Sequence, residues 1–262
     1  MIDLHTHILP DWDDGARDWD EALRMCEIAA ADGIKKIVLT PHIYRMSRHN
    51  DDLAVLDERM AQFRERTAQF LIAFYRGAEV FVHHDMDKNI PAQRFGINDS
   101  SYVFIEFASD QIPHGVRDLI YKIMMKRHVP VISHPERNHV FAEHPGVLYD
   151  LVCMGCLAQV TAMSLCGGFG RHIRQRAALF MKHNLVHIIA SDAHNAETRP
   201  PILSRAVKEA KKIVGAEKAE AMVTLVPQAI LDNKVIPDLG EPENPERRKI
   251  WTIRLPFGKK GT

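Results

Sequence analysis

The sequence predicts an α/β fold in which parallel strands and helices alternate to form a barrel. Three observations support this fold class. Apolar, strand-like runs alternate with helix-like segments seven times along the 262 residues. The composition, 46% hydrophobic, is sufficient for the core of one barrel domain. Six of the apolar runs end in histidine or a carboxylate, and the active sites of parallel barrels lie at such strand ends.

The first half of the chain alternates strands and helices with clear boundary signals. Ile2 to His7 reads as a strand, and a helix is expected over 19–32, capped by Asp18 or Asp20 and stopped by Gly33. The remaining elements expected here are a strand at 34–39, a loop at 43–49 that could overhang the barrel mouth, a solvated helix at 50–69, a strand at 71–82, and a loop over 83–100.

The second half continues the alternation. Tyr102 to Phe107 is hydrophobic on both faces apart from Glu106, as expected for a parallel strand covered on both sides. The elements expected after it are a helix at 114–127, a strand at 129–133, a helix at 145–154, a strand at 156–161, a helix at 171–183 opened by a glycine-rich turn, a strand at 186–190, and helices at 201–213 and 216–223.

We expect one barrel domain over residues 1–240 and a tail over 241–262. The tail is rich in Pro, Glu and Lys, which favours a solvated terminus. Within it, 250–255 alternates apolar and polar residues, so this hexapeptide is predicted to dock on its own barrel or on a neighbouring subunit. Oligomerisation is left open.

Charge and cysteine content restrict the classes of function. Lys+Arg and Asp+Glu both number 34, so net charge gives no reason to expect nucleic-acid binding. No apolar run approaches 18 residues and the N-terminus is a charged strand, so we expect no membrane insertion and a cytoplasmic location. Cys153 and Cys156 have redox-motif spacing but lie at a helix-to-strand junction, and we interpret them as small buried residues.

Eight histidines and carboxylates fall at or near the ends of predicted strands. A strand alternates its faces, so His5 and His7 point the same way and can converge on a metal ion. A carboxylate buried in a strand needs a cation or partner, which applies to Glu79 and Glu106. Eight ligands exceed what one ion needs, so two or three bridged ions are expected. The predicted ligands are His5, His7, His42, Glu79, Glu106, His134, Asp192 and His194.

Two arginines follow these ligands closely in the sequence. Arg137 lies three residues after His134, and Arg199 lies five residues after His194. A guanidinium can bind two phosphate oxygens at once, so both are candidates for recognising an anionic substrate. Arg45 and Arg48 are weaker candidates. The chain contains neither a cysteine-phosphatase signature nor a G-x-S-x-G elbow, which disfavours a covalent mechanism.

The strand-end motifs together resemble the polymerase and histidinol phosphatase (PHP) superfamily. The matching segments are Asp3-Leu4-His5-Thr6-His7, Thr40-Pro41-His42, Gly77-Ala78-Glu79, Ile105-Glu106-Phe107, Ser133-His134-Pro135-Glu136-Arg137 and Ser191-Asp192-Ala193-His194. Ile8-Leu9-Pro10, Asp13-Asp14-Gly15 and Gly168-Phe169-Gly170 are similar to the bacterial protein-tyrosine phosphatases of capsule and exopolysaccharide synthesis. Asp11-Trp12 and Ala108 depart from that pattern.

The resemblance implies a distorted (β/α)7 TIM-like barrel with a trinuclear, usually manganese-dependent site, in which Fe or Zn could also be found. It implies that the eight strand-end residues are ligands and that Arg137 and Arg199 bind phosphate. The implied reaction is hydrolysis of phosphotyrosine on the tail of a partner tyrosine kinase, through attack by a metal-bound hydroxide. The alternatives are a small-molecule phosphatase of the histidinol-phosphate type and a phosphodiesterase.

Overall fold

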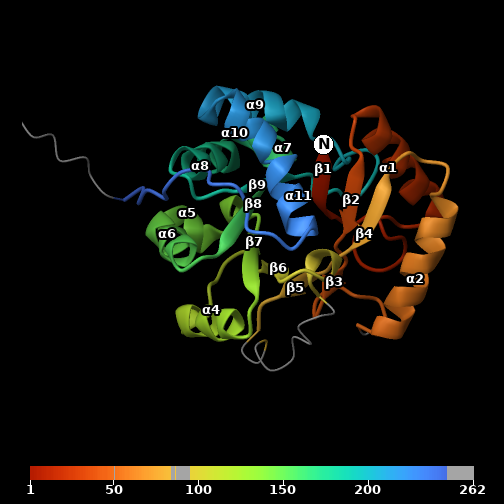
Figure 1. Cartoon of the computed structure of the whole chain (residues 1–262), viewed down its shortest axis with the longest axis horizontal. Coiled ribbons are helices and arrows are strands. Elements are labelled where there is room, and N and C mark those ends of the chain that lie inside the picture. The colour runs from red at the N-terminus through yellow and green to blue at the C-terminus, as the bar shows by residue number, and fades with distance from the viewer. Residues whose placement is uncertain (50, 84–85, 87–94, 247–262) are drawn as a thin grey trace, which may run out of the picture.

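The computed structural model describes residues 1–49, 51–83, 86 and 95–246 (Figure 1). All strand pairs in this part of the chain are parallel, and they form two sheets with the orders β1-β2-β4 and β3-β5-β6-β7-β8-β9. The strands are β1 Ile2–Thr6, β2 Lys36–Leu39, β3 His42–Ile43, β4 Ala73–Arg76, β5 Glu79–Phe81, β6 Tyr102–Glu106, β7 Val129–Ser133, β8 Leu157–Thr161 and β9 Ile188–Ala190.

The two sheets are parts of one barrel of seven strands. β2 and β3 are consecutive pieces of one strand, interrupted at 40–41, and β4 and β5 are likewise interrupted at 77–78. A parallel bridge between Thr6 and Ala193 closes the ring from β1 to the segment after β9. The predicted α/β fold with a distorted (β/α)7 barrel is therefore confirmed.

The third predicted strand, 71–82, is not continuous, and Gly77 lies at its interruption. A Cβ atom on Gly77 would lie 2.7 Å from Cγ1 of Val38 on the neighbouring strand. This is closer than side-chain carbons normally approach, so the break brings the two backbones together at a position that requires glycine. Beyond the break the register pairs His42 with Glu79, which places two predicted ligands side by side.

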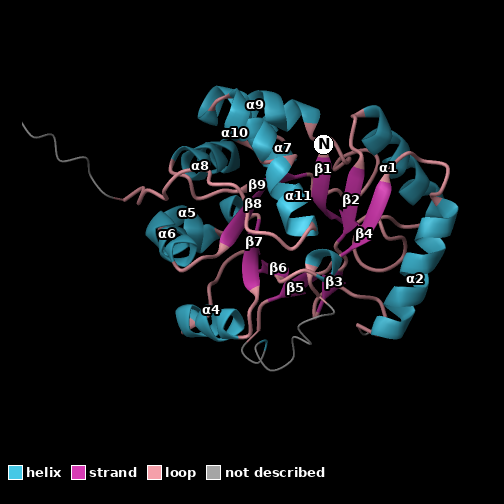
Figure 2. Cartoon of the chain, viewed as in Figure 1, coloured by secondary structure: helices cyan, strands magenta, loops and turns pink. Residues whose placement is uncertain are grey.

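Helices surround the strands, which gather at the centre of the view in Figure 2. Asp18 caps the first helix as predicted, accepting a hydrogen bond from the Glu21 backbone N–H at 2.8 Å. The helices are α1 Trp19–Ala31, α2 Leu53–Arg66, α4 Val116–Met125, α5 His139–Glu143, α6 Pro145–Cys153, α7 Ala162–Cys166, α8 Arg171–Lys182, α9 Ser204–Val214, α10 Ala216–Ala221 and α11 Leu225–Leu231, with 3-10 turns η1 Ile97–Asp99 and η2 Pro135–Arg137. The sequence interpretation missed α5, α7 and α11, which are too short to show a clear helical period.

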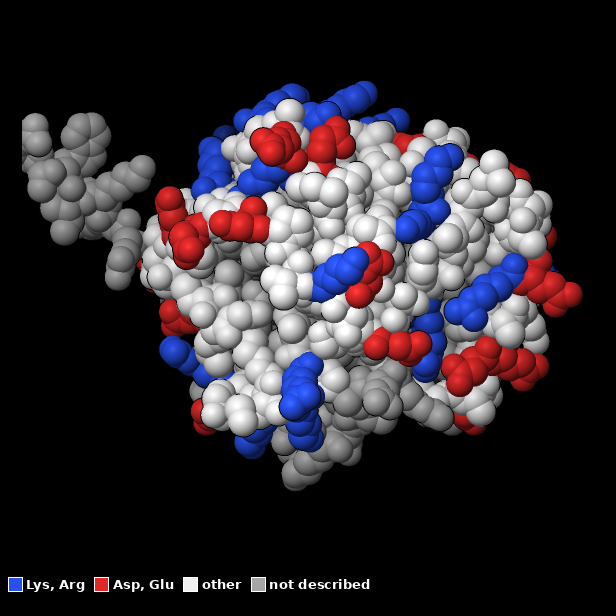
Figure 3. All heavy atoms as spheres, viewed as in Figure 1, with Lys and Arg blue, Asp and Glu red and all other residues white. Residues whose placement is uncertain are grey.

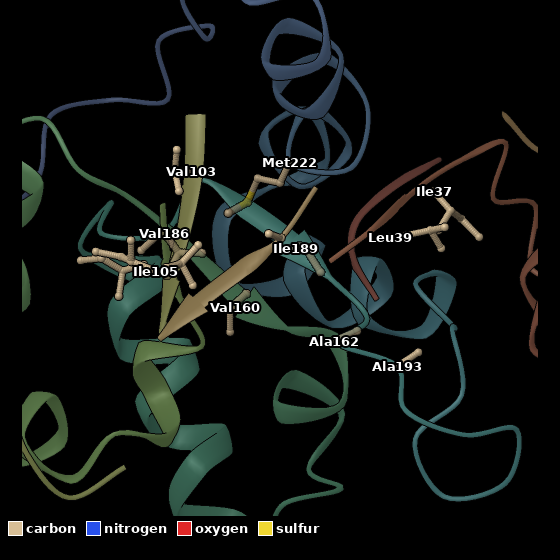
Figure 4. Close-up of a cluster of buried hydrophobic side chains, with 14 of the residues drawn as sticks. Ile37, Leu39, Val103, Ile105, Val160, Ala162, Val186, Ile189, Ala193 and Met222 are labelled. Carbon is tan, nitrogen blue, oxygen red and sulfur yellow. The ribbon is translucent and has the colours of Figure 1, made fainter. Parts of the chain in front are cut away.

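Two apolar layers fill the molecule. Outward-facing side chains such as Val103, Ile105 and Ile189 pack between the strands and the helices (Figure 4). Inward-facing side chains, among them Leu4 and Phe104, fill the barrel itself together with Val226, Ile230 and Leu231 of α11. Helix α11 therefore covers the N-terminal end of the barrel, and the polar strand ends remain at the opposite mouth.

Residues 241–246 lie against the barrel rather than apart from it. The Glu243 backbone N–H donates to the His183 carbonyl at 2.8 Å, and the Asn184 side chain donates to the Glu241 carbonyl at 2.8 Å. A carboxylate oxygen of Glu246 accepts from the Gly146 N–H at 3.1 Å. The predicted boundary at 240 remains a prediction, and the hexapeptide 250–255 lies outside the described residues.

The surface of the molecule carries charges of both signs. Basic and acidic side chains are interspersed over the face shown in Figure 3. Among the described residues, no helix combines the length and apolar character needed to cross a bilayer.

Cys156 is buried as expected, but Cys153 is exposed, so the interpretation of Cys153 as a buried residue is wrong. Cys153 ends α6 on its solvent side, which short-range spacing could not show.

Candidate metal centre

Strand β1 carries the first two predicted ligands into the barrel mouth. His5 and His7 are both buried, and their Nε2 atoms lie 3.1 Å apart. Both rings come from one face of the strand, as the two-residue period predicts. Two ring nitrogens directed at the same point form a suitable pair of donors for a transition-metal ion.

Glu79 lies at the centre of the predicted ligands. Its Oε2 is 3.3 Å from His5 Nε2, 3.4 Å from His7 Nε2 and 3.3 Å from His42 Nδ1, and its Oε1 is 3.2 Å from His134 Nε2. Both carboxylate oxygens are buried without a hydrogen-bond partner of good geometry among the described residues. Burial alone would raise the pKa of Glu79, but the surrounding imidazoles hold its pKa well below its usual value. Glu79 therefore remains an anion that needs cationic partners.

Glu106 faces two of the ring nitrogens that Glu79 also faces. Its Oε2 is 3.7 Å from His42 Nδ1, and its Oε1 is 3.8 Å from His134 Nε2. Burial and the neighbouring carboxylate of Glu79 raise the pKa of Glu106. Two carboxylates facing the same imidazoles repel one another, and a divalent cation would relieve that repulsion.

The two carboxylate oxygens of Asp192 face different groups: Oδ1 faces histidines, and Oδ2 faces arginines. Its Oδ1 is 3.6 Å from His7 Nε2 and 3.5 Å from His194 Nδ1. Its Oδ2 accepts from Arg137 Nη1 at 2.6 Å and from Arg199 Nη2 at 2.7 Å. Burial acts to raise the pKa of Asp192, but Arg199 and the nearby histidines hold it far below its usual range. The carboxylate is therefore ionised and fixed in orientation.

All eight predicted ligands meet at one mouth of the barrel, and they form groups that fit more than one ion. Three sets of ligand atoms lie within 4.8 Å of one another: His7, Asp14, His42 and His194; His5, His7 and Asp192; His42, Glu79 and Glu106. His134 joins them through Glu79 and Glu106. The mixture of imidazole and carboxylate donors, together with the buried oxygens of Glu79 that lack a well-formed hydrogen bond among the described residues, fits two or three divalent cations.

Asp14 joins these groups although it was not among the predicted ligands. Its Oδ1 lies 3.4 Å from His42 Nε2 and 3.5 Å from His194 Nε2. Burial acts to raise the pKa of Asp14, but these two imidazoles and His7 lower it. The sequence signal was the Asp13-Asp14-Gly15 motif, to which no role was assigned.

Asp13 supports the ligands from behind. Its Oδ2 lies 2.9 Å from His7 Nδ1 and also accepts from the His42 backbone N–H at 2.9 Å, while Oδ1 accepts from the Gly15 N–H at 2.9 Å. A carboxylate on one ring nitrogen of histidine orients the other nitrogen toward a metal. Asp13 thereby links the loop after β1 to the start of β3.

Gln159 supports two other ligands in the same way. Its Oε1 lies 3.1 Å from His5 Nδ1 and accepts from the His134 backbone N–H at 3.3 Å. Gln159 is fully buried in the middle of β8. A lone amide within a buried strand was the signal that could have identified it.

Phe169 contacts both predicted phosphate-binding arginines. The guanidinium carbons of Arg137 and Arg199 lie 5.0 Å and 5.7 Å from its ring centroid. The ring comes from the glycine-flanked turn between α7 and α8. The sequence predicts a helix start there and a segment similar to the bacterial tyrosine phosphatases, but no role for Phe169. The aromatic face and Asp192 together hold the two guanidinium groups beside the ligands.

The loop before α2 contributes Arg45 but directs Arg48 elsewhere. Arg45 Nη1 lies 3.7 Å from Glu106 Oε2, whereas Arg48 Nη1 donates to Asp11 Oδ1 at 3.2 Å on the outer surface. His49 Nε2, in the same loop, lies 2.8 Å from the Asp11 carbonyl oxygen. The resulting cavity, here called the metal pocket, has a volume of about 200 Å³. It is lined by Asp14, His42, Arg45, Met46, Glu79, Glu106, His134, Arg137, Asp192, His194 and Arg199.

Sequence comparison matches residues 1–232 to the family described as capsular polysaccharide synthesis, CpsB/CapC. The chain is 34% identical over 255 residues to tyrosine-protein phosphatase YwqE of Bacillus subtilis, covering 96% of this chain and 99% of the relative. It is 33% identical to putative tyrosine-protein phosphatase CapC of Staphylococcus aureus, covering 84% and 88%. It is 31% identical to CpsB of Streptococcus pneumoniae, covering 90% and 100%.

Structural comparison agrees with the sequence comparison. A crystal structure from work on YwqE of Bacillus subtilis and CpsB of Streptococcus pneumoniae, described as unique metal-dependent tyrosine phosphatases, matches with a TM-score of 0.89 at 32% identity. The match covers 94% of this chain and 100% of that chain. Histidinol phosphate phosphatase from Lactococcus lactis matches with a TM-score of 0.52 at 13% identity, which shows a shared fold. From the family match and the two agreeing comparisons, we conclude that this chain belongs to the CpsB/CapC family of capsular polysaccharide synthesis.

Proposed function

We propose that this chain is a metal-dependent tyrosine-protein phosphatase that hydrolyses phosphotyrosine on a partner kinase controlling capsular or exopolysaccharide synthesis. The observation that carries the proposal is Glu79, a buried carboxylate whose oxygens lie 3.2–3.4 Å from ring nitrogens of four histidines and have no hydrogen-bond partner of good geometry among the described residues. The family relatives, which are named tyrosine-protein phosphatases, support the choice of substrate. Location in the cytoplasm is part of the proposal, and the four free thiols are compatible with a reducing compartment.

The proposed roles of the strand-end residues follow from their chemistry. Divalent ions held there supply charge neutralisation and an activated water. We propose Mn²⁺ as the resident ion, with Fe or Zn as alternatives, because a mixed imidazole and carboxylate set does not select manganese by affinity. The proposed ligands are His5, His7, His42, Glu79, Glu106, His134, Asp192 and His194, to which Asp14 is added.

Arg137 and Arg199 are proposed to bind the phosphoryl oxygens. Each guanidinium donates to Asp192 Oδ2 through one Nη atom, and Arg199 Nη2 donates also to the Asp192 carbonyl at 3.1 Å. Both arginines line the metal pocket, where the second Nη atom of each is proposed to meet a substrate. Because Asp192 and Phe169 hold both groups in place, little reorganisation is needed when an anion arrives. Donors fixed in this way stabilise the charge that spreads over the phosphoryl oxygens in the transition state.

Chelation and metal restoration test the dependence on metal. We expect hydrolysis of p-nitrophenyl phosphate to be lost after EDTA treatment and restored by Mn²⁺. Glu79→Gln should lose bound metal in elemental analysis because it removes the central anion, while Glu143→Gln, on the exposed end of α5, should retain it. Activity that survives thorough chelation would contradict the proposal.

Comparison of substrates tests the reaction class. We expect a phosphotyrosyl peptide to have a higher kcat/KM than histidinol phosphate or a bis-aryl phosphodiester. A clear preference for histidinol phosphate would instead assign a small-molecule phosphatase, and a preference for the diester would assign a phosphodiesterase. Either result would overturn the proposed substrate without affecting the metal dependence.

A further inference from the structure

Helices α8 and α9 form a basic face of the molecule. Together they carry eight Lys and Arg residues and a single acidic residue, Glu209, although the whole chain has 34 residues of each sign. Lys and Arg side chains gather along the upper edge of the molecule in Figure 3, over α9 as labelled in Figure 1. A neutral chain that concentrates positive charge on two neighbouring helices has a local field that attracts anions.

Part of this positive charge is not neutralised by carboxylates of the protein. Glu209 accepts from Arg174 Nη2 at 2.9 Å and from Lys212 Nζ at 2.6 Å, so it links α8 to α9 and is already paired with two cations. Arg205 and Lys208 are both exposed, and within the described part of the chain neither forms an ion pair. These two side chains are therefore available to an anion from outside the molecule.

A cavity of about 330 Å³ connects this face with the phosphate-binding arginines. We call it the α9 pocket; its lining includes Cys166 at the end of α7, Arg199 and Ile202 in the loop before α9, and Arg205 in α9. Cys166 and Arg205 are exposed and Ile202 is partly exposed, so these walls are accessible to a ligand. Arg199 also lines the metal pocket, so one arginine side chain contributes to both cavities.

Arginines from both basic helices act on the same wall of the α9 pocket. Burial and the charge of Glu209 raise the pKa of the Cys166 thiol, whereas the charges of Arg205 and Arg174 lower it. Glu197 is the carboxylate in the lining, and it also lines the neighbouring cavity beside the loop after β1, so it lies at the border of the α9 pocket. The wall formed by α7 and α9 is therefore the positively charged part of the cavity.

We propose that the α9 pocket and the exposed basic side chains beside it bind carboxylate side chains that flank the phosphotyrosine of the substrate. This inference rests on the proposed function and adds a preference for the sequence around the phosphotyrosine. An extended chain advances about 3.3–3.6 Å per residue, so side chains within a few residues of a phosphotyrosine in the metal pocket reach the α9 pocket. There a guanidinium can bind a carboxylate through two parallel hydrogen bonds.

An anionic membrane is the other polyanion that a basic face could bind, and two observations favour a peptide. The α9 pocket is concave, so it fits a side chain better than it fits a flat layer of lipid head groups. None of the large hydrophobic side chains exposed in the described part of the chain lies on α8 or α9. The face therefore offers no apolar group for insertion into a bilayer.

Binding of two peptide analogues to the Mn²⁺-loaded protein tests the inference by calorimetry. Both peptides carry a non-hydrolysable difluorophosphonate analogue of phosphotyrosine, flanked on each side by two Glu residues in one peptide and by two Gln residues in the other. We expect the wild type to bind the Glu-flanked peptide roughly 3- to 30-fold more tightly. The difference should shrink when NaCl is raised from about 50 mM to about 500 mM, because salt screens exposed charges.

Paired substitutions assign the preference to the basic face. Arg205→Gln with Lys208→Gln should remove most of the preference while leaving the affinity for the Gln-flanked peptide unchanged. Arg205→Glu with Lys208→Glu should make the Glu-flanked peptide the weaker ligand. The matched control is Arg24→Gln with Lys122→Gln, which removes the same charge from exposed positions of α1 and α4 and should keep the wild-type preference.

The inference is overturned if the wild type does not distinguish the two peptides, if the charge-reversed variant keeps the wild-type preference, or if the control variant loses it. It is also overturned if the charge-reversed variant keeps the peptide preference but no longer sediments with phosphatidylserine vesicles that the wild type binds, a result that would assign the face to a membrane. Failure of the wild type to hydrolyse a phosphotyrosyl peptide would instead contradict the proposed function, because binding of the analogues requires no turnover.

Discussion

At the scale of single residues, the site depends on groups that do not themselves face the ions. Asp13 bonds the far nitrogen of His7 and the backbone of His42, and Gln159 does the same for His5 and His134. Such contacts fix the direction of each imidazole. The metal affinity of the site should therefore respond to both residues even though neither is a proposed ligand.

Asp13→Ala should weaken divalent-metal binding by roughly 10- to 100-fold, because His7 loses the carboxylate that orients it. Titration of the metal-free protein with Mn²⁺ in a calorimeter measures the change. Asp20→Ala, on the exposed first turn of α1, removes an aspartate of equal size and should leave the affinity unchanged. Equal affinities for the two variants would show that Asp13 has no orienting role.

Phe169→Leu should lower kcat/KM by roughly 5- to 30-fold, because each of the two guanidinium groups loses a cation–π contact of about 0.5–1 kcal/mol. Inhibition by inorganic phosphate should weaken in parallel if the arginines bind the phosphoryl oxygens. Phe169→Trp retains an aromatic face and should keep most of the activity. If the leucine and tryptophan variants behave alike, bulk rather than the aromatic face holds the arginines.

At the scale of elements, the residue immediately before β9, His187, extends the hydrogen bonding between β9 and β8 by one residue. The Ala158 backbone N–H donates to His187 Nδ1 at 3.2 Å, and the His187 N–H donates to the Ala158 carbonyl at 2.9 Å. Burial, followed by the charge of Lys218, lowers the pKa of His187 from 6.5 to about 4. Protonation would remove the acceptor, so the neutral imidazole belongs to the folded state.

The stability that His187 contributes should be fully present above pH 6.5 and lost as pH falls toward about 4. The sign follows because the unfolded chain binds the proton first over this range. His187→Gln keeps an acceptor without titrating, so its free energy of unfolding in urea should fall less between pH 7 and 4.5. His172→Gln, exposed on α8, should follow the wild type. A glutamine variant with the wild-type pH dependence would contradict this assignment.

At the scale of the whole molecule, the segment 241–246 connects parts of the barrel distant in sequence. It bonds residues 183 and 184 after α8 and Gly146 in α6. A chain ending at 240 should therefore unfold at a lower temperature than a chain ending at 246, by roughly 6–12 °C if each of the three lost hydrogen bonds contributes about 1 kcal/mol. Identical melting temperatures would show that the segment contributes nothing to stability.

Comparison of the chain ending at 246 with the full chain tests a separate prediction, that the hexapeptide 250–255 docks. A loss of stability or a change of oligomer mass on removing 247–262 would support docking. Unchanged melting and sedimentation would show a passive terminus. Because both shortened chains keep every proposed metal ligand, metal content serves as the control for a correctly formed site.

The sequence by itself determined the barrel class and the location of the site. The alternation of side chains along a strand and the residue at which a strand ends can both be read from neighbouring residues. His5, His7 and the later strand-end residues could therefore be assigned to one mouth once the strands were predicted to be parallel. The buried carboxylates of Glu79 and Glu106 were informative for the same local reason, because a charge within an apolar strand requires a partner.

Only the tertiary structure decided which groups meet around those ligands. Asp14 and Phe169 lie in loops, whose conformations depend on contacts with residues far away in the sequence. The position of Arg45 at the barrel mouth and the cover of the opposite end by α11 depend on packing between distant segments. The central position of Glu79 among four histidines arises because four different strand regions converge there, and no short-range pattern encodes that convergence.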